Sequence, residues 1–250
     1  MIMAAAERSG RVDVETLSTS FEVTPQTIRK DLNDLCDRDL LLRTHGGAVY
    51  PQGASNFAYV ARQGQAPDAK RDIGAAAASL IGDNASVFLT IGTTTEQVAT
   101  HLRSHTGLMV ITNNLNVATI LADAPSCQLV IAGGLVRKSD GGIVGEATLD
   151  FVGQFRVDFA VIGVSAIDAD GTLLDYDYRE VRVLQEIIRL ARRTILVADA
   201  TKFERNAPVR IASLSDIDIL VTDRDLPAPL AEFAAANGVR VNIPALAEAA

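Results

Sequence analysis

Residues 86–103 read SVFLTIGTTTEQVATHLR, and this stretch indicates how the larger part of the chain folds. An apolar run typical of a strand covers residues 86–91, and a helical pattern begins at Thr95. The segment Gly92–Thr95 opens that helix. Backbone N–H groups at a helix N-terminus, joined by hydroxyl groups, form an anion site. A plain helix cap explains the same four residues equally well, so both interpretations stand at this point.

Short apolar strands and helices alternate through the rest of the chain after residue 68. Strands that are buried on both faces read as continuous apolar runs, so the pattern predicts a mostly parallel α/β sheet covered by helices on both faces. The expected strands are 86–91, 108–112, 127–132, 157–164, 194–198, 218–222 and 239–242, and the expected helices are 68–81, 95–103, 116–122, 146–154, 178–191 and 229–236.

Several loops that follow expected strands carry residues able to hold a polar ligand. In open α/β sheets ligands bind beyond the carboxyl ends of the strands, where these loops lie. Lys202 would add a cation for phosphate, unless it is a surface lysine. Glu180 would accept ligand hydroxyl groups, unless it only caps its helix. The expected effector-binding residues are Gly92, Thr93, Thr94, Thr95, Asn113, Asn114, Gly133, Gly134, Glu180 and Lys202.

Residues 24–35, TPQTIRKDLNDL, indicate a second, smaller unit near the start of the chain. Thr24 is a favoured N-cap, Pro25 suits the first helical position, and a short helical pattern over 13–20 precedes them. The apolar face of the expected helix holds Ile28, Leu32 and Leu35. The opposite face, whose side chains can read base edges and phosphates, holds Gln26, Arg29, Lys30 and Asn33.

Residues 40–50, LLLRTHGGAVY, read as a β-hairpin with a glycine turn, and a hairpin after a recognition helix is a wing. The alternative is a generic helical domain with a charged face, which fits the six Lys and Arg against eight Asp and Glu in residues 1–50. The order of helix, turn, capped helix and wing favours DNA binding. The expected DNA-binding residues are Thr24, Gln26, Thr27, Arg29, Lys30, Asn33, Arg43 and His45.

Composition and patterning set the boundaries and the compartment that we expect. The predicted division is a winged helix-turn-helix domain at 1–50, a linker at 51–69 and an effector-sensing α/β domain at 70–250. The net charge of −8 repels DNA, so nucleic-acid contacts must come from a local basic patch. Two separated cysteines, without a secretory leader or a membrane-length apolar run, favour a cytoplasmic protein with no membrane partner. The three histidines form no metal-type grouping, and we expect neither a metal nor a cofactor.

The segment TPQTIRKDLNDL at 24–35, followed by LLRTHGGA at 41–48, resembles the DeoR family of transcriptional repressors. The similarity extends to ITNNLNVA at 111–118, DGGIVGEATLDF at 140–151 and DYREVR at 177–182, so it covers essentially the whole chain. The resemblance implies that operator double-stranded DNA is a partner and that the protein forms a homo-oligomer, either a dimer or a tetramer.

The resemblance also implies a regulatory role. Such a protein would repress genes of glycerol 3-phosphate metabolism until an inducer binds. The implied inducer is sn-glycerol 3-phosphate or a related phosphorylated polyol, with another sugar phosphate as the alternative. Two positions depart from the family pattern. Thr90 stands where the family has Asp, two residues before the glycine of GTTT, and Glu204 stands where the family has glycine.

A sugar-phosphate isomerase is the competing hypothesis, because the sensing domain of this family resembles ribose-5-phosphate isomerase in fold. The stretch VDFAVIGVSAIDADGTL at 157–173 is similar to a strand and loop of that enzyme. Isomerisation needs a placed carboxylate to move a proton. The positions that match the enzyme's acids hold Ile162, Ser165 and Ala166, and Asp175 stands where the enzyme has lysine. The sequence therefore favours a sensor over an enzyme.

Overall fold

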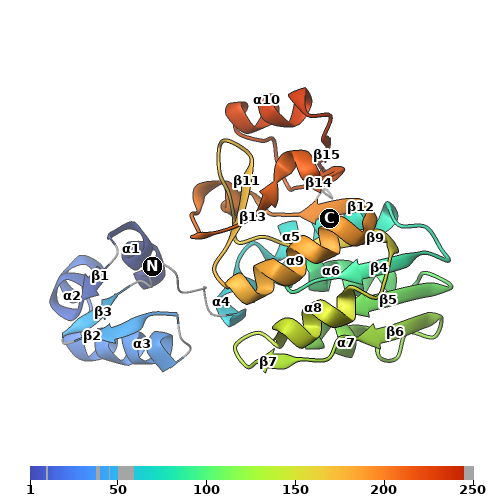
Figure 1. Cartoon of the computed structure of the whole chain (residues 1–250). Helices are drawn as coiled ribbons and strands as arrows, with labels where there is room; N and C mark the ends of the chain where they lie inside the picture. Colours follow the sequence, from blue (N-terminus) through green and yellow to red (C-terminus); the bar gives the residue numbers. More distant parts are fainter. Residues whose placement is uncertain (10, 38–39, 45, 50–58, 245–250) are drawn as a thin grey trace. The chain divides into compact units, whose positions relative to one another are not determined.

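The computed structural model describes residues 1–9, 11–37, 40–44, 46–49 and 59–244. The chain forms two compact units, Met1–Gln65 and Ala66–Ala250 (Figure 1). The buried apolar side chains of the first unit form one cluster, and those of the second unit form clusters of their own. The two units are therefore described separately.

The first unit contains the helix, turn and helix that the sequence predicts. Asp13 caps α2, because its Oδ1 atom accepts a hydrogen bond from the Thr16 N–H at 2.8 Å. Glu22 ends α2 in the left-handed conformation, with φ of 54°, and so makes the turn into the next helix. The elements are α1 Ile2–Ser9, β1 Arg11–Asp13, α2 Val14–Phe21, α3 Pro25–Asp37, β2 Leu42–Thr44 and β3 Gly47–Val49.

A small antiparallel sheet in the order β1-β3-β2 forms the wing of this unit. Gly47 approaches Val12 so closely that a Cβ atom there would lie 2.1 Å from the Val12 carbonyl oxygen, so only glycine fits. Ile28 and Leu32 of α3 are buried, and Leu35 packs against the same cluster. The predicted apolar face of the recognition helix and the predicted wing are both confirmed.

The second unit is built on a seven-stranded sheet whose neighbouring strands are all parallel. This confirms the predicted sheet, and one expected strand, 108–112, has the observed bounds. In spatial order the strands are β15 Arg240–Asn242, β14 Ile219–Val221, β12 Ala191–Val197, β9 Val157–Ile162, β4 Ser86–Leu89, β5 Leu108–Thr112 and β6 Cys127–Ile131.

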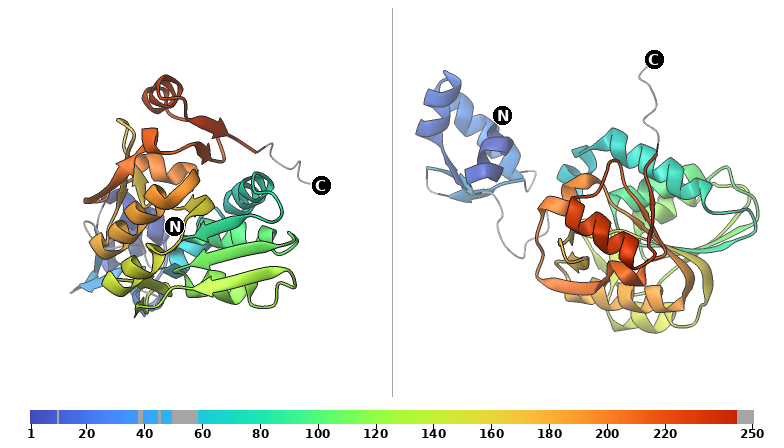
Figure 2. Two further views of the ribbon diagram at one scale, coloured as in Figure 1. Left: turned by 45° about the vertical axis from the view of Figure 1, so that its right-hand side comes forward. Right: turned by 90° about the horizontal axis from the view of Figure 1, so that it is seen from above.

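Helices cover both faces of this sheet (Figure 2). Val87 and Leu89 of β4 pack in one cluster and Phe88 packs in the other, as expected for a strand buried on both sides. The first cluster includes α5 Pro67–Ser79, α6 Thr93–Leu102 and α7 Leu115–Leu121, and the second includes α8 Glu146–Val152, α9 Tyr178–Leu190 and α10 Ala228–Ala236. No helix among the described residues is long and apolar enough to cross a membrane.

Several short elements lie where the sequence predicted irregular chain. They are the helix α4 Tyr59–Gly64, the hairpin of β7 Leu135–Arg137 and β8 Gly142–Val144, the sheet of β10 Ala166–Ile167, β11 Thr172–Asp175 and β13 Val209–Ser213, and the 3₁₀ turns η1 Ala200–Glu204 and η2 Leu214–Asp216. Elements of two to six residues are too short to show a clear hydrophobic period. The expectation of irregular chain across 51–69 therefore fails at α4 and at the start of α5, while residues 51–58 lie outside the described residues.

Candidate functional site

The Gly92 loop, Gly92–Thr95, lies where β4 passes into α6 at the carboxyl edge of the sheet, with Gly92 as the N-cap and the threonines in the first turn of the helix. Gly92 has φ of +151°, a conformation that favours glycine, and the three threonines after it are buried. The first N–H groups of a helix have no partner within that helix, so an anion can accept their hydrogen bonds. The Thr95 hydroxyl donates to the carbonyl oxygens of Thr90 at 2.8 Å and Gly92 at 2.7 Å, and therefore fixes the loop.

Lys70 lies beside this loop, although the sequence interpretation passed over it. The helices α5 and α6 run in the same direction, because Gly74 meets Gln97 and, further along, Ile81 meets His105. A Cβ on Gly74 would lie 2.7 Å from the Gln97 Cβ, and the His105 Nε2 atom lies 3.0 Å from the Ile81 carbonyl oxygen. Lys70 is one turn before Gly74, level with the first turn of α6, and is 3% exposed. Lys70 is therefore a buried residue of α5 at the level of the α6 N-terminus.

Asn113 and Asn114 follow β5, which is the next strand to β4. Asn114 caps α7, because its Oδ1 atom accepts a hydrogen bond from the Asn116 N–H at 2.9 Å, and its Nδ2 atom donates to Glu96 Oε1 at 3.3 Å. Asn113 Nδ2 donates to the Ile143 carbonyl at 3.1 Å. The Asn113 Oδ1 atom is buried and accepts no hydrogen bond from the part of the chain that the structure describes. Of the two amides, Asn113 is the one with an acceptor to offer a ligand.

Gly133 and Gly134 serve the packing of their loop, which follows the edge strand β6. The Thr148 hydroxyl of α8 donates to the Gly133 carbonyl at 3.0 Å. Gly134 has φ of +151°, and a Cβ atom there would lie 2.2 Å from that hydroxyl oxygen. The pair lies two strands from β4, roughly 10 Å away, so ligand contact stays a prediction for both glycines.

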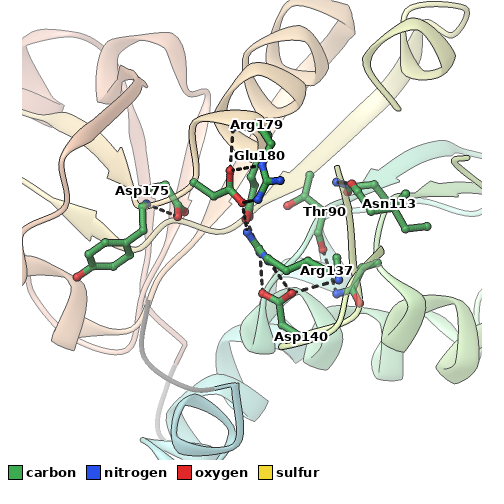
Figure 3. A network of polar contacts seen from close by, with 12 residues as sticks. Thr90, Asn113, Arg137, Asp140, Asp175, Arg179 and Glu180 are labelled. Carbon is green, nitrogen blue, oxygen red and sulfur yellow. Dashed lines mark hydrogen bonds and ion pairs between the residues drawn. The ribbon is translucent and has the colours of Figure 1, made fainter. Parts of the chain in front are cut away.

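Arg137, which the sequence interpretation also passed over, holds three carboxylates together (Figure 3). It lies on β7 and its side chain is 16% exposed. Its Nε and Nη2 atoms donate to the two Asp140 oxygens at 2.9 and 2.7 Å. Its Nη1 atom donates to Asp177 at 3.0 Å, and Nη2 also donates to Glu180 at 2.6 Å. The guanidinium group therefore joins the β7–β8 hairpin to the start of α9.

Glu180 lies in the first turn of α9 and is buried within this network. Asp177 is the N-cap of α9, because its Oδ1 atom accepts a hydrogen bond from the Arg179 N–H at 2.9 Å. Burial and the neighbouring Asp175 carboxylate raise the pKa of Glu180 to about 8, against the effect of Arg137. The capping role therefore belongs to Asp177, and hydroxyl binding by Glu180 stays a prediction.

Lys202 lies in η1, beyond the end of β12, and is 8% exposed. The strand β9 separates β12 from β4, so Lys202 belongs to the same edge of the sheet as the Gly92 loop but starts roughly 10 Å from it. Asp199 caps η1 by accepting a hydrogen bond from the Thr201 N–H at 3.1 Å. The burial of Lys202 argues against an ordinary surface lysine, and its phosphate contact stays a prediction.

The positions that match the isomerase acids hold no proton-transfer group. Ile162 and Ala166 are fully buried and apolar, and Ser165 is 7% exposed. Within the described residues no group of three or more His, Cys, Asp or Glu side chains could hold a metal ion. These three side chains therefore do not supply the carboxylate that isomerisation needs.

The predicted DNA-reading face of α3 is exposed along its length. Its exposed side chains are Gln26, Arg29, Lys30 and Asn33. Arg43 of β2 donates a hydrogen bond from Nη2 to Asn33 Oδ1, so the wing is tied to the recognition helix. The Thr24 hydroxyl accepts a hydrogen bond from the Thr27 N–H at 3.2 Å, which makes Thr24 the cap. His45 lies outside the described residues.

Comparison with known proteins identifies both units. The DeoR-like helix-turn-helix domain matches residues 2–53, and the DeoR C-terminal sensor domain matches residues 65–224. The glycerol-3-phosphate regulon repressor of Haemophilus influenzae is 48% identical over 93% of this chain and 90% of its own length. The repressor of the same name from Escherichia coli is 41% identical over 97% of this chain and 96% of its own length. These relatives are repressors, which decides against the isomerase hypothesis.

Solved structures with a similar fold are more distant. Ribose 5-phosphate isomerase A from Methanocaldococcus jannaschii is 16% identical, with a TM-score of 0.41 over 55% of this chain and 54% of that one. The β subunit of eIF2B from Chaetomium thermophilum is also 16% identical, with a TM-score of 0.45 over 62% and 48%. The chain thus spans about half the length of each. The two domain matches and the relatives, by contrast, cover most of this chain, and the protein therefore belongs to the DeoR family of helix-turn-helix transcriptional repressors.

Proposed function

We propose that this protein represses genes of glycerol 3-phosphate metabolism and leaves its operator when a phosphorylated polyol binds the second unit. The inducer that we favour is sn-glycerol 3-phosphate. The proposal is supported by the pairing, in one chain, of an exposed polar recognition helix with a glycine-led helix N-terminus, at whose level Lys70 is buried on the neighbouring helix. The names of the two relatives support the choice of regulon.

The phosphate end of the proposed site consists of the N-terminus of α6, with Lys70 close to it. The N–H groups of the Gly92–Thr95 loop would donate to phosphate oxygens, and the helix dipole and the ammonium group would both stabilise the negative charge. Asn113 leaves the neighbouring strand next to Thr90, because Leu89 pairs with Thr112 in the sheet. The polyol end therefore lies toward β5 and the Arg137 network.

Self-association forms part of the proposal. The first 50 residues carry more acidic than basic side chains, so a single head binds DNA poorly. Two heads on one operator convert the second contact into an intramolecular one and raise the overall affinity. We therefore propose a cytoplasmic homo-oligomer, a dimer or a tetramer, as the DNA-binding form.

An operator titration tests the proposed function. Fluorescence anisotropy of labelled promoter DNA from a glycerol 3-phosphate operon would be measured with and without sn-glycerol 3-phosphate. The proposal predicts that the ligand weakens operator binding, and that ribose 5-phosphate and glucose 6-phosphate do so less at equal concentration. Release by one of the sugar phosphates alone would assign a different inducer to the same architecture. Unchanged operator affinity with every ligand would contradict the proposal.

Thr90 allows a direct test of the polyol end. Its hydroxyl donates to the Val161 carbonyl at 3.3 Å, and the residue is 1% exposed. A carboxylate at this position would accept a charge-assisted hydrogen bond from a ligand hydroxyl, which is worth about 1.5–3 kcal/mol against about 1 kcal/mol for a neutral one. Thr90→Asp should therefore tighten glycerol 3-phosphate binding, measured by calorimetry, while inorganic phosphate binding stays equal or weakens. Thr90→Asn is the uncharged control, and equal weakening of both ligands by Thr90→Asp would place Thr90 away from the polyol.

A further inference from the structure

The region next to the proposed polyol end presents hydrogen-bond acceptors. The Asn113 amide cannot flip without losing the hydrogen bond that Nδ2 donates to the Ile143 carbonyl. Its Oδ1 atom is therefore the acceptor that has no partner among the described residues. A buried acceptor without a partner is costly, and a ligand donor would remove that cost. Asn113 is 3% exposed, so bulk water does not compensate for the missing donor.

The guanidinium group of Arg137 is already paired with protein carboxylates (Figure 3). A guanidinium group has five N–H donors, and four hydrogen bonds join Arg137 to Asp140, Asp177 and Glu180. Arg179, the second cation of the cluster, donates to Asp177 as well, so both guanidinium groups are paired with protein carboxylates. The raised pKa of Glu180, caused by burial and by Asp175, reflects the negative potential of these carboxylates.

Hydrogen bonds connect the Gly92 loop to the Arg137 cluster, which consists of Arg137, Asp140, Asp177, Arg179 and Glu180. Asn116 Nδ2 donates both to Glu96 of the first turn of α6, at 3.0 Å, and to the Asp140 carbonyl, at 2.9 Å. The Ile143 N–H donates to the Asn113 carbonyl at 2.7 Å, so β8 binds both the backbone and the side chain of Asn113. The acceptors at the polyol end are therefore held at fixed positions relative to the phosphate end.

We propose that the effector site selects phosphorylated polyols whose only charged group is the phosphate, and rejects phosphorylated carboxylic acids of the same length. A ligand hydroxyl donates to Asn113 Oδ1, whereas a ligand carboxylate is repelled by that acceptor and by the carboxylates around Arg137. Like charges that lie close together in a site lower the binding affinity strongly. The site therefore distinguishes the two classes of ligand by repulsion as well as by attraction. This inference rests on the proposed function, in that it assumes a phosphate bound at the α6 N-terminus.

The test compares three ligands on the full-length protein by isothermal calorimetry. The ligands are sn-glycerol 3-phosphate, 3-phosphoglycerate, which carries a carboxylate on the same three-carbon chain, and inorganic phosphate. We expect glycerol 3-phosphate to bind about tenfold or more tightly than 3-phosphoglycerate. Equal or reversed affinities of the two three-carbon ligands would overturn the inference, even if glycerol 3-phosphate still releases the operator. Failure of all three ligands to bind would overturn the effector site itself and this inference with it.

Two variants separate the two proposed causes of this selectivity, the attraction of the ligand hydroxyl and the repulsion of the ligand carboxylate. Asn113→Leu removes the acceptor, so glycerol 3-phosphate should bind about fivefold more weakly while inorganic phosphate is unchanged. At pH 9, above the pKa of about 8 of Glu180, Glu180→Gln removes one negative charge, so the difference in affinity between the two three-carbon ligands should narrow there. The matched control is Thr222→Val. This change removes a buried hydroxyl that also lacks a partner among the described residues and that lies at the end of β14, three strands from β4. The affinities of both three-carbon ligands should stay unchanged. An unchanged difference in affinity in folded Glu180→Gln at pH 9 together with unchanged glycerol 3-phosphate binding in folded Asn113→Leu would overturn the inference.

Discussion

Replacement of Arg137 by methionine should lower the free energy of unfolding of the second unit by about 3–5 kcal/mol, because it leaves buried carboxylates without a counter-charge. Asp140 and Glu180 have side chains that are 1% and 6% exposed, so water cannot take over the role of the guanidinium group. Methionine keeps much of the length of the side chain, so the loss would not come from a large cavity. Urea denaturation followed by circular dichroism measures the change.

The matched control for Arg137→Met is Arg182→Met on α9. Arg182 forms an ion pair with Glu146, but the two side chains are 52% and 70% exposed, so this change should cost at most about 1 kcal/mol. The loss in free energy of unfolding caused by Arg137→Met should become smaller as the pH falls from about 8 to about 5. Burial and Asp175 raise the pKa of Glu180 to about 8, and the loss of Arg137 removes a group that lowers it, so the folded state takes up a proton in that range and gains stability. Equal costs for the two arginines would contradict the role given to Arg137.

Replacement of Arg29 by alanine should weaken operator binding by about 1–3 kcal/mol and relax sequence preference, if Arg29 reads a base edge. The residue is exposed on the polar face of α3, and its neighbours on the apolar face, Ile28 and Leu32, fix the orientation of the helix. Lys30→Ala should instead weaken binding to all sequences alike if Lys30 contacts a phosphate, and should flatten the salt dependence. Titrations of operator and scrambled DNA at several salt concentrations separate the two cases.

A charge-matched control excludes a general electrostatic effect of these changes. Arg240 is exposed on β15 of the second unit, and Arg240→Ala removes the same charge from the chain. Operator affinity of this variant should match that of the parent. If Arg29→Ala and Lys30→Ala behave like Arg240→Ala at moderate salt, then α3 is not the recognition helix.

The sequence predicted the architecture well because its signals are local. A capped helix start at Thr24–Pro25, a glycine wing and the strand–glycine–helix pattern at 86–103 each lie within a few residues. All three are present, although the strand ends at Leu89 and the helix begins at Thr93, two residues earlier than predicted in each case. Short pairings such as β10 with β11 were missed because two residues of strand show no alternation. Their formation depends on neighbours that only the tertiary structure brings close.

The candidate site was predicted less completely, because its charged members depend on distant partners. Arg137 bonds to carboxylates 40 and 43 residues further along the chain, and nothing in its own segment marks those contacts. Lys70 did leave a signal, since it shares the buried face of α5 with Ile73, Gly74 and Ala77. A lysine on an apolar helix face is a candidate for a buried ionic or ligand contact.

The most direct test of the account is the affinity of sn-glycerol 3-phosphate for the protein alone and for the protein saturated with operator DNA. Two sites coupled through one chain must influence each other by the same factor in both directions. Calorimetry should therefore give weaker ligand binding to the operator complex, by the factor with which the ligand weakens operator binding in the anisotropy titration. Equal ligand affinity with and without operator would contradict the claim that the second unit controls the DNA-binding head.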